Sequence, residues 1–212
     1  AIPSTEDKLV QEGVKRLLNA IYEQDFLDSS HGFRPHRSCH TAIRDLNDCL
    51  MNKPVNFIVE VDIRNFFGEV SHYWLLRCLE ERVTDPNFLW VIRRLLQAGV
   101  MEDGQIELSE QGTPQGGIAS PILANIYLHF VLDIWFERVF RKQSQNFMQI
   151  TRYCDDFVVA FESRKDAEAF LQQLEERFAK FGLEVAKEKT RLIEFGRRVW
   201  KRHKTNDTKG AS

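Results

Sequence analysis

The sequence predicts an α+β fold in which a small β-sheet is backed by helices on one face. Two observations carry this prediction. Apolar residues recur at helical spacing in several segments, whereas other short runs are rich in β-branched residues, as strands are. From the first strand onward the order is strand, helices, hairpin, helix, strand–turn–strand, helix and strand.

The N-terminal half begins with two predicted helices. Apolar residues such as Val14 and Leu18 are spaced for a helix over residues 6–27, which the Gly- and Pro-bearing stretch 29–35 ends. A second helix is expected over 41–50. The β-branched run 55–62 predicts a strand that ends at Asp62, followed by helices that start at Ser71 and cover about 86–97.

The C-terminal half combines a hairpin, two helices and several strand-like runs. Asp103-Gly104 is a strong hairpin signal at the centre of residues 100–108. Ser120 is expected to cap a long buried helix that has Pro121 in its first turn. Ser163 and Asp166 resemble a capping box that opens an amphipathic helix closed by Gly182. The strand-like runs are 148–153, 157–161, 183–185 and 190–195.

Composition excludes several classes of protein. The chain has 212 residues, of which 43% are hydrophobic and 28% charged, so it can bury the core of one large domain or two small lobes. A disordered tail, a collagen and a small disulfide scaffold are excluded. We expect no membrane span and no signal peptide. The four cysteines lie far apart, which favours reduced thiols over disulfides or a zinc ribbon.

Charge is unevenly distributed along the chain. The net charge is −2, but residues 187–212 hold nine Lys and Arg against three acidic residues, which leaves −8 for the remainder. A basic end on an acidic body is compatible with phosphate binding beside a carboxylate metal site. It is equally compatible with a solvated tail, and charge alone favours the tail.

The aspartates at Asp62, Asp155 and Asp156 are the first candidates for chemistry. Aspartates at a tight turn usually bond the local backbone, and Asp62 has a similar structural interpretation as a strand-end cap. Adjacent strands lie about 4.8 Å apart, however, so a carboxylate at one strand end and a pair on a neighbouring hairpin could converge on cations. Oxygen ligands without nearby His or Cys favour Mg²⁺ over zinc, and two such ions about 3.5–4 Å apart are typical of phosphoryl transfer. The sequence does not show that the two strands are neighbours.

Other motifs give weaker signals. The glycine loop 112–117 allows backbone to approach a flat ligand, although such a loop is usually only a turn. His36 and His40 could mimic a zinc pair, but no second pair of ligands follows, so we interpret them as structural or surface residues. Cys154 is interpreted as a small spacer and not as a nucleophile.

These segments together resemble a known family. The carrying motifs are Ile2-Pro3 with Asp7-Lys8, the run 30–38 (SHGFRPHRS), Val61-Asp62-Ile63 with Phe66-Phe67, the loop 112–117 (GTPQGG) with Ser120-Pro121, Tyr153-Cys154-Asp155-Asp156, and Glu188-Lys189-Thr190. They occur in family order over nearly the whole chain. The chain resembles a reverse transcriptase of the kind encoded within bacterial group II introns, often called a maturase. The run 190–197 and the G-F-R-P-x-R-S phrase favour this branch over retroviral enzymes.

The resemblance implies a role for each matching residue. Asp62 and Asp155 match the metal-binding carboxylates, with the Ile63 carbonyl as a further ligand and Asp156 as a weaker or indirect one. Phe67 matches the steric gate beneath the sugar 2′ position. Gln115 and Gly116 match the loop that packs on the incoming nucleotide. Lys8 matches a cation that meets the triphosphate, and Lys189 a lysine proposed to protonate pyrophosphate.

The resemblance also implies a right-hand polymerase fold, with fingers, a ferredoxin-like palm sheet and no thumb within the chain. Cys154, Gly68 and Ala186 depart from the residues usual in the family (Ala, Asp and Asn), and the last departure weakens the assignment of Lys189. The expected parts are fingers 1–54, first palm strand 55–70, a connection with a hairpin 71–118, palm 119–196 and basic tail 197–212.

The implied activity is RNA-directed DNA polymerisation with two Mg²⁺ ions, for which Mn²⁺ can substitute. The implied partners are intron RNA template and primer, dNTPs and a DNA target in the bacterial cytoplasm, without a membrane, and a homodimer remains open. One alternative is an RNA-binding maturase module without polymerase activity in this chain. A nucleotide cyclase on a similar palm ranks low, because its Gly-Gly-x-x-Phe hairpin signature is absent.

Overall fold

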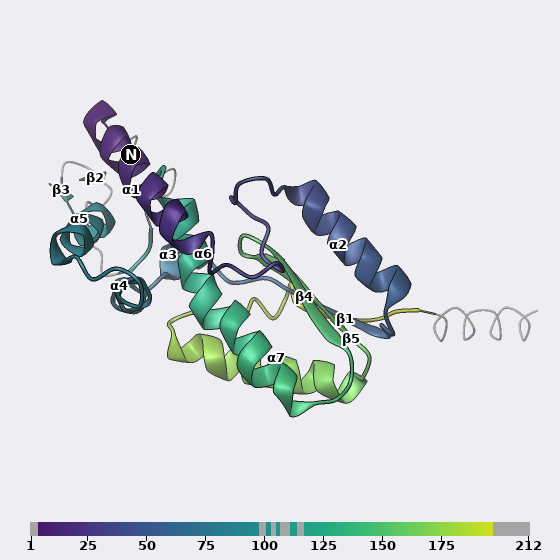
Figure 1. Ribbon diagram of the computed structural model, residues 1–212. Helices are drawn as coiled ribbons and strands as arrows, with labels where there is room; N and C mark the ends of the chain where they lie inside the picture. The colour runs from purple at the N-terminus through teal and green to yellow at the C-terminus, as the bar shows by residue number, and fades with distance from the viewer. Residues whose placement is uncertain (1–3, 98–100, 103–104, 107–110, 114–116, 197–212) are drawn as a thin grey trace, which may run out of the picture.

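A computed structural model describes residues 4–97, 101–102, 105–106, 111–113 and 117–196. Its centre is an antiparallel four-stranded sheet in the order β4-β5-β1-β6 (Figure 1). The strands are β1 (Phe57–Val61), β4 (Met148–Tyr153), β5 (Asp156–Phe161) and β6 (Arg191–Glu194). The fold is therefore α+β, as predicted.

Strand register separates the two faces of the sheet. Val59 pairs with Val159 and, across β5, Val159 pairs with Ile150, and all three side chains are buried. Side chains alternate along a strand, so the neighbouring positions face the other side. Glu60 and Asp156 lie among those positions and are exposed. One face therefore carries the core, and the other faces outward at the end that holds the aspartates.

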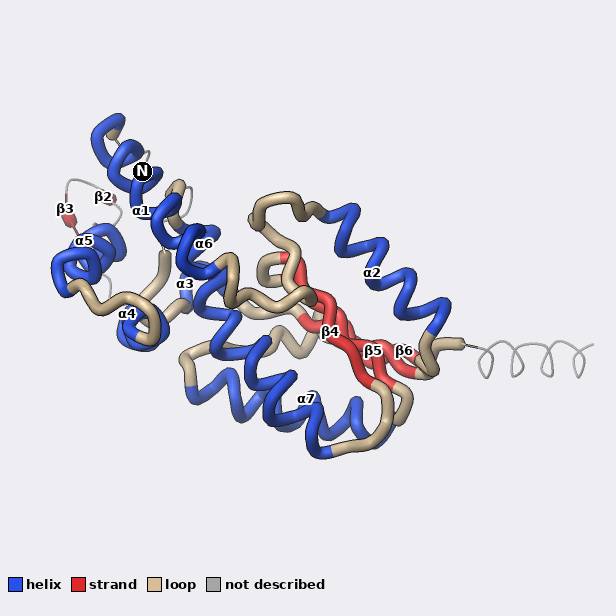
Figure 2. The backbone as a smooth tube through the Cα atoms, in the orientation of Figure 1, coloured by secondary structure: helices blue, strands red, loops and turns tan. Residues whose placement is uncertain are grey.

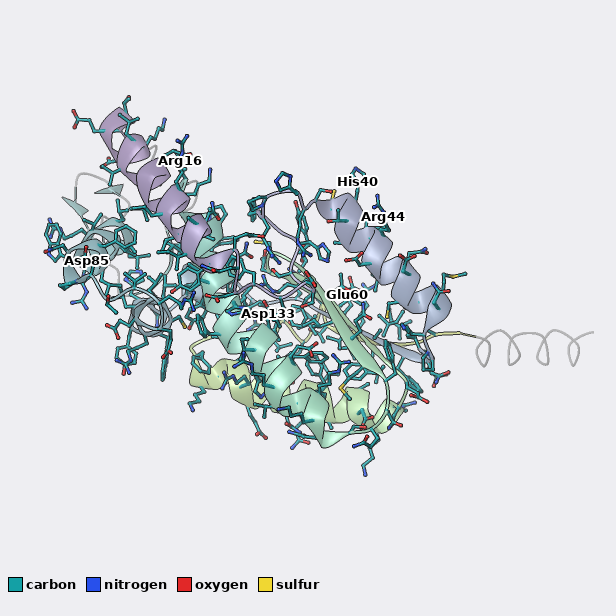
Figure 3. The ribbon with its side chains drawn as sticks, viewed as in Figure 1. Arg16, His40, Arg44, Glu60, Asp85 and Asp133 are labelled. Carbon is teal, nitrogen blue, oxygen red and sulfur yellow. The ribbon has the colours of Figure 1, made fainter. Side chains whose placement is uncertain are left out.

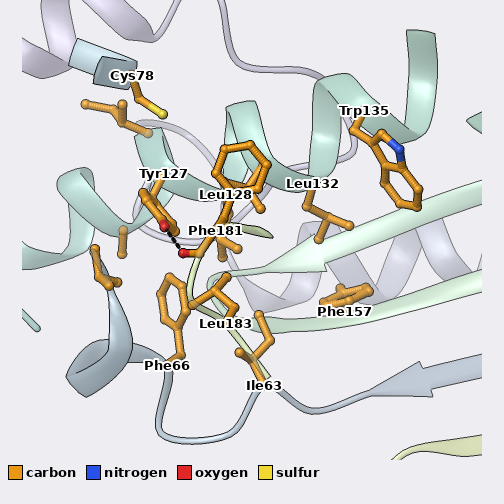
Figure 4. Packing of buried hydrophobic residues seen from close by; sticks show 14 of the residues in the cluster. Ile63, Phe66, Cys78, Tyr127, Leu128, Leu132, Trp135, Phe157, Phe181 and Leu183 are labelled. Atoms are coloured by element: carbon orange, nitrogen blue, oxygen red, sulfur yellow. Dashed lines mark hydrogen bonds between the residues drawn. The ribbon is translucent and has the colours of Figure 1, made fainter. Parts of the chain in front are cut away.

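Helices cover the core face. A continuous helical rod comprises α6 (Ser120–Leu128), the π-helical turns η1 (His129–Asp133) and η2 (Phe136–Phe140), and a final 3₁₀ turn, η3 (Arg141–Gln143). It packs with α7 (Arg164–Lys180) beneath the strands (Figure 2). In Figure 4, Tyr127 of the rod donates a hydrogen bond to the Phe181 carbonyl beside Leu183 and Ile63. The buried rod therefore also anchors the chain that follows α7.

A helical group lies at one end of the sheet. It contains α1 (Thr5–Tyr22), α4 (His72–Glu80) and α5 (Pro86–Gln97), beside the short strands β2 (Met101–Glu102) and β3 (Gln105–Ile106) (Figure 1). Tyr22 is fully buried and donates to the carbonyls of Cys78 and Leu79 at 3.2 and 3.1 Å. These two hydrogen bonds join α1 to α4. Among the described helices, none is long and apolar enough to cross a bilayer.

The structure corrects several details predicted from the sequence. A short helix, α3 (Phe66–Glu69), follows the first strand and was not predicted. The N-cap of α6 is Ala119, and Ser120 is already helical. Ser163 precedes α7 without a capping hydrogen bond, because Asp166 accepts from Ser144 and Asn146 instead.

Helices are also not confined to one face of the sheet. The C-terminal end of α2 (Cys39–Asn52) packs Cys49 with Val55 and Ala160 on the opposite face (Figure 2). The first helix also ends earlier than predicted, at Tyr22, and the 183–185 run forms only one bridge, from Val185 to Ile63.

Candidate active site

A two-residue turn presents two of the aspartates. Tyr153 pairs with Asp156, so Cys154 and Asp155 form the turn between β4 and β5. Cys154 has a φ of 61°, which matches the positive φ at the first loop position of the primed turns that favour tight hairpins. Cys154 and Asp155 therefore do form a tight turn, but the turn alone does not explain why carboxylates stand there.

The register of the sheet brings Asp62 to the same place. β1 pairs with β5 as far as Val61 and Phe157. One further step along this antiparallel register sets Asp62 beside Asp156. The strands that the sequence analysis needed as neighbours are therefore adjacent.

The electrostatics of the site reflect this convergence. Desolvation raises the pKa of Asp156, and the charges of Asp155 and Asp62 raise it further. Lys189 opposes these effects; its Nζ lies 3.4 Å from Asp62 Oδ2. Burial, and after it the Asp155 charge, raises the pKa of the Cys154 thiol to about 12, so this side chain stays neutral.

The backbone that follows β1 is hydrogen-bonded along one side by residues 184–186. Ile63 forms an antiparallel bridge with Val185, flanked by bonds from Ala186 N–H to the Asp62 carbonyl (2.9 Å) and from Arg64 N–H to the Glu184 carbonyl (2.8 Å). In such a bridge the central residue turns its own carbonyl away from its partner. The Ile63 carbonyl is thereby directed toward the β5 side, where the aspartates lie.

Phe67 and the glycine loop lie against each other. The Phe67 side chain is half-buried, whereas its neighbour Phe66 is buried, and their rings meet edge to face at 5.2 Å. Thr113 N–H donates to the Phe67 carbonyl at 2.7 Å, and Gly112 N–H donates to the Val70 carbonyl at 2.9 Å. The start of the glycine loop is thus held against the Phe67 backbone. Gln115 and Gly116 lie outside the described residues.

Other predicted candidates lie apart from this group. Lys8 is exposed on α1 and, within the described part of the chain, has no hydrogen bond or ion pair to the aspartates. His36 and His40 are exposed, and His40 projects from the start of α2 (Figure 3). A cavity of about 710 Å³ lies between α2 and β4, but its lining does not include the three aspartates.

Comparison with known proteins assigns the family. The family model described as reverse transcriptase (RNA-dependent DNA polymerase) matches residues 1–206. The chain belongs to the reverse transcriptase family.

Two curated relatives of this family member are intron proteins by name. The group II intron-encoded protein LtrA of Lactococcus lactis subsp. cremoris is 43% identical over 137 residues, 63% of this chain and 22% of LtrA. An uncharacterized 91 kDa protein in the cob intron of Schizosaccharomyces pombe is 44% identical over 138 residues, 65% of this chain and 17% of that protein. The chain therefore spans about a fifth of the length of these relatives.

Solved structures confirm the polymerase fold. Apo telomerase from Candida tropicalis superposes with a TM-score of 0.65 at 17% identity, covering 88% of this chain and 36% of that one. Telomerase from Candida albicans, solved with a fragment of telomeric RNA, gives 0.64 at 16% identity and covers 90% and 35%. At such identity the likeness shows the fold alone.

The donor set of this reverse transcriptase family member fits a hard divalent cation. Carboxylate and carbonyl oxygens are the ligands that Mg²⁺ prefers, and Asp62, Ile63 and the Asp155–Asp156 hairpin offer them at one end of the sheet. Desolvation, and after it the charges of neighbouring carboxylates, raises the pKa of Asp156, and those charges favour a cation there. In the residues described, no three His, Cys, Asp or Glu side chains are already gathered at metal-binding spacing, and the Lys189 ammonium lies at Asp62.

Two residues near the site were not predicted from the sequence. Asn65 adopts a left-handed φ of 42° and starts α3, which carries Phe67. Arg152 precedes Tyr153 and is fully buried. A signal for Arg152 was present, because it shares the alternation of Met148 and Ile150 and therefore points into the core.

Proposed function

We propose that the chain is the fingers and palm of a group II intron-type reverse transcriptase, which copies RNA into DNA. The observation that carries the proposal is the meeting of Asp62 with the Asp155–Asp156 hairpin at one open end of the sheet. The half-buried Phe67 and the start of the glycine loop both lie in the segment that connects β1 to α6. The family match and the intron-encoded relatives support the choice of substrate.

Each residue has a distinct task in this proposal. Asp62 and Asp155, with the Ile63 carbonyl, hold two Mg²⁺ ions, and Asp156 contributes less directly. Bound Mg²⁺ would lower the pKa of the primer 3′-hydroxyl and stabilise the pyrophosphate leaving group. Phe67 excludes the ribose 2′-hydroxyl, and Gln115 and Gly116 pack on the incoming dNTP. Lys189, whose Nζ lies 3.4 Å from Asp62 Oδ2, would supply a positive charge to the phosphates.

The parts of the chain follow the family arrangement in this proposal. Residues 1–54 belong to the fingers, with Lys8 meeting the triphosphate, and residues 55–70 and 119–196 to the palm. Residues 71–118 connect the two, and 197–212 contribute basic charge toward RNA. The partners are intron RNA, primer and a DNA target, and RNA of this kind is recognised through its shape and phosphates.

Primer extension tests the proposal. The chain, and a longer form, are given a primed RNA template, dNTPs and Mg²⁺. We expect extension by wild type and none by Asp155→Asn, because a neutral amide binds divalent ions poorly. Asp48→Asn on α2, which changes an exposed aspartate away from the site, serves as the matched control and should extend normally.

The outcomes separate the candidate functions. Equal extension by wild type and Asp155→Asn would remove the aspartates from the site. RNA binding without extension by the longer form would instead support a maturase module that lacks polymerase activity. Conversion of a nucleoside triphosphate to a cyclic product would support the cyclase alternative.

A further inference from the structure

A buried ionic network lies directly behind the β4–β5 hairpin, which carries Asp155 and Asp156. Arg152 is 0% exposed and donates through Nε and Nη2 to the two carboxylate oxygens of Asp133, at 2.8 and 2.5 Å. Its Nη1 donates to the side-chain oxygen of Asn125 at 3.0 Å and to the Cys154 carbonyl at 2.8 Å. One guanidinium thus joins the helical rod to the first residue of the turn.

The loop that carries the G-F-R-P phrase closes the network from the other side. Asn125 donates to the Gly32 carbonyl at 2.6 Å, and His31 N–H donates to the Arg152 carbonyl at 2.9 Å. A Cβ added to Gly32 would lie 2.4 Å from the Cys154 nitrogen. The turn is therefore contacted by two segments that are distant in sequence, in addition to its own strands.

The rod is shaped to place Asp133 there. Asp133 ends the π-helical turn η1 and is fully buried (Figure 3). A π-helical turn inserted in a longer helix is uncommon and frequently accompanies functional sites. Asp133 lies within this turn, and its carboxylate meets Arg152 of β4.

Stability alone is a weak reason for such an arrangement. A buried ion pair can often be replaced by apolar residues of similar size at no cost in stability, because desolvation offsets the attraction. What an apolar pair cannot do is donate a hydrogen bond to the Cys154 carbonyl. Lysine also cannot do everything that Arg152 does, because its single ammonium lacks the planar fork that reaches both Asp133 oxygens and two further acceptors.

We infer that Arg152, Asp133 and Asn125 are positioning residues, which fix the Cys154 peptide and thereby aim Asp155 at the cation site. This inference rests on the proposed function for its consequence in catalysis. Its structural content, a turn held from behind by the guanidinium, is testable without any activity.

The decisive variant removes both charges. Arg152→Met with Asp133→Leu keeps the volume apolar but leaves the Cys154 carbonyl and the Asn125 side-chain oxygen without their donor, so we expect a folded protein with a modestly lower melting temperature. Hydrogen exchange of peptides covering 153–157 should become about tenfold faster, equal to about 1.4 kcal/mol. Exchange in 57–61 should not change. Mn²⁺ binding, measured by paramagnetic resonance of the free ion, should weaken several-fold.

A second variant and a control guard against misfolding. Arg152→Lys retains the charge, and we expect the same local loss of protection, so it decides the question if the double variant fails to fold. Arg177→Met is the matched control: Arg177 donates to the Val131 carbonyl at 3.0 Å, within the same helical turn as Asp133, but does not contact the hairpin. It should leave exchange at 153–157 unchanged.

Failure of the inference and failure of the proposed function give different results. Wild-type exchange at 153–157 and wild-type Mn²⁺ affinity in a folded Arg152 variant would overturn the inference. If instead wild type and Asp155→Asn bind Mn²⁺ equally, the proposed function fails, while the exchange data still decide whether Arg152 holds the turn.

Discussion

Asp156 is the aspartate whose surroundings oppose its charge. Desolvation and the charges of Asp155, Asp62 and Glu60 together raise its pKa above the ordinary value of 3.8. The folded state therefore binds the Asp156 proton more tightly than the unfolded state does. At neutral pH, where the carboxylate is ionised, this group destabilises the fold.

We accordingly predict that Asp156→Asn raises the melting temperature at pH 7. The gain should shrink as the pH falls through the raised pKa, and it should vanish below about pH 3.8, where Asp156 is protonated in both states. Thermal unfolding of both proteins from pH 7 to pH 3 provides the measurement. Primer extension by Asp156→Asn should fall less than extension by Asp155→Asn. A lower melting temperature at pH 7 would contradict the expected repulsion.

Substitution of Phe67 can distinguish a core-packing role of this side chain from a role as a steric gate. As a core residue, Phe67→Val would cost about 1–3 kcal/mol of stability and would affect all substrates alike. As a gate, it should raise ribonucleotide incorporation far more than deoxyribonucleotide incorporation. The half-buried side chain, beside the fully packed Phe66, favours the second effect.

Single-nucleotide addition with dCTP against CTP measures this selectivity. Phe66→Val is the control, because its ring is 2% exposed and its loss should lower stability without changing the dCTP:CTP ratio. An unchanged ratio in a folded, active Phe67→Val would remove Phe67 from the site. It would also weaken the register that assigns Asp62, five residues earlier.

At the scale of elements, two glycines make a matched pair. Gly32 lies against the hairpin, where a Cβ would meet the Cys154 nitrogen at 2.4 Å, whereas Gly13 on α1 has nothing within 4 Å. We predict that Gly32→Ala destabilises the fold by about 1–3 kcal/mol, because backbone atoms cannot yield cheaply. Gly13→Ala should stabilise it by up to about 1 kcal/mol through helix propensity.

Urea unfolding of the two variants measures both effects. The two substitutions add the same methyl group, so a difference in sign reports the surroundings and not the chemistry. Destabilisation by both alanines would mean that the contact at Cys154 is not what distinguishes Gly32.

Elements set by local sequence signals were predicted better than those that depend on contacts between distant parts of the chain. Pro86–Gln97 was predicted with correct bounds and Gly182 was predicted to end α7, because periodicity and a positive φ of 76° are local properties. Ser163 is the N-cap residue of α7, but the capping box predicted with Asp166 was wrong because Asp166 accepts from Ser144 and Asn146, which come from a different part of the chain. α3 was missed because its four residues are too short for any period to register.

At the scale of the whole molecule, the candidate site was predictable in its members but not in its support. Asp62 and the hairpin could be named because a strand end and a turn are visible in sequence. That β1 lies next to β5 is a matter of sheet order, which no local pattern gives. The Arg152–Asp133 pair could not be named either, because its partners come from separate elements and meet only in the folded core.

The uneven charge of the chain leads to a prediction for RNA binding. Removal of residues 197–209, which lie outside those described, deletes six Lys and Arg and one Asp, so the net charge falls from −2 to −7. We predict weaker binding to any RNA and a shallower dependence of log affinity on log salt, because fewer counterions are released. Titrations at several salt concentrations measure the slope. An unchanged slope would mean that the tail is merely solvated.

The sheet order also has a consequence for synthesis of the protein. β1 lies between β5 and β6, and Val61 is made 96 residues before its partner Phe157. At roughly 5–20 residues per second, the central strand waits on the order of 5–20 s for its neighbours. During that interval both of its edges are unpaired, a condition that promotes aggregation. Slower translation between residues 62 and 156 should therefore lower the yield of soluble protein.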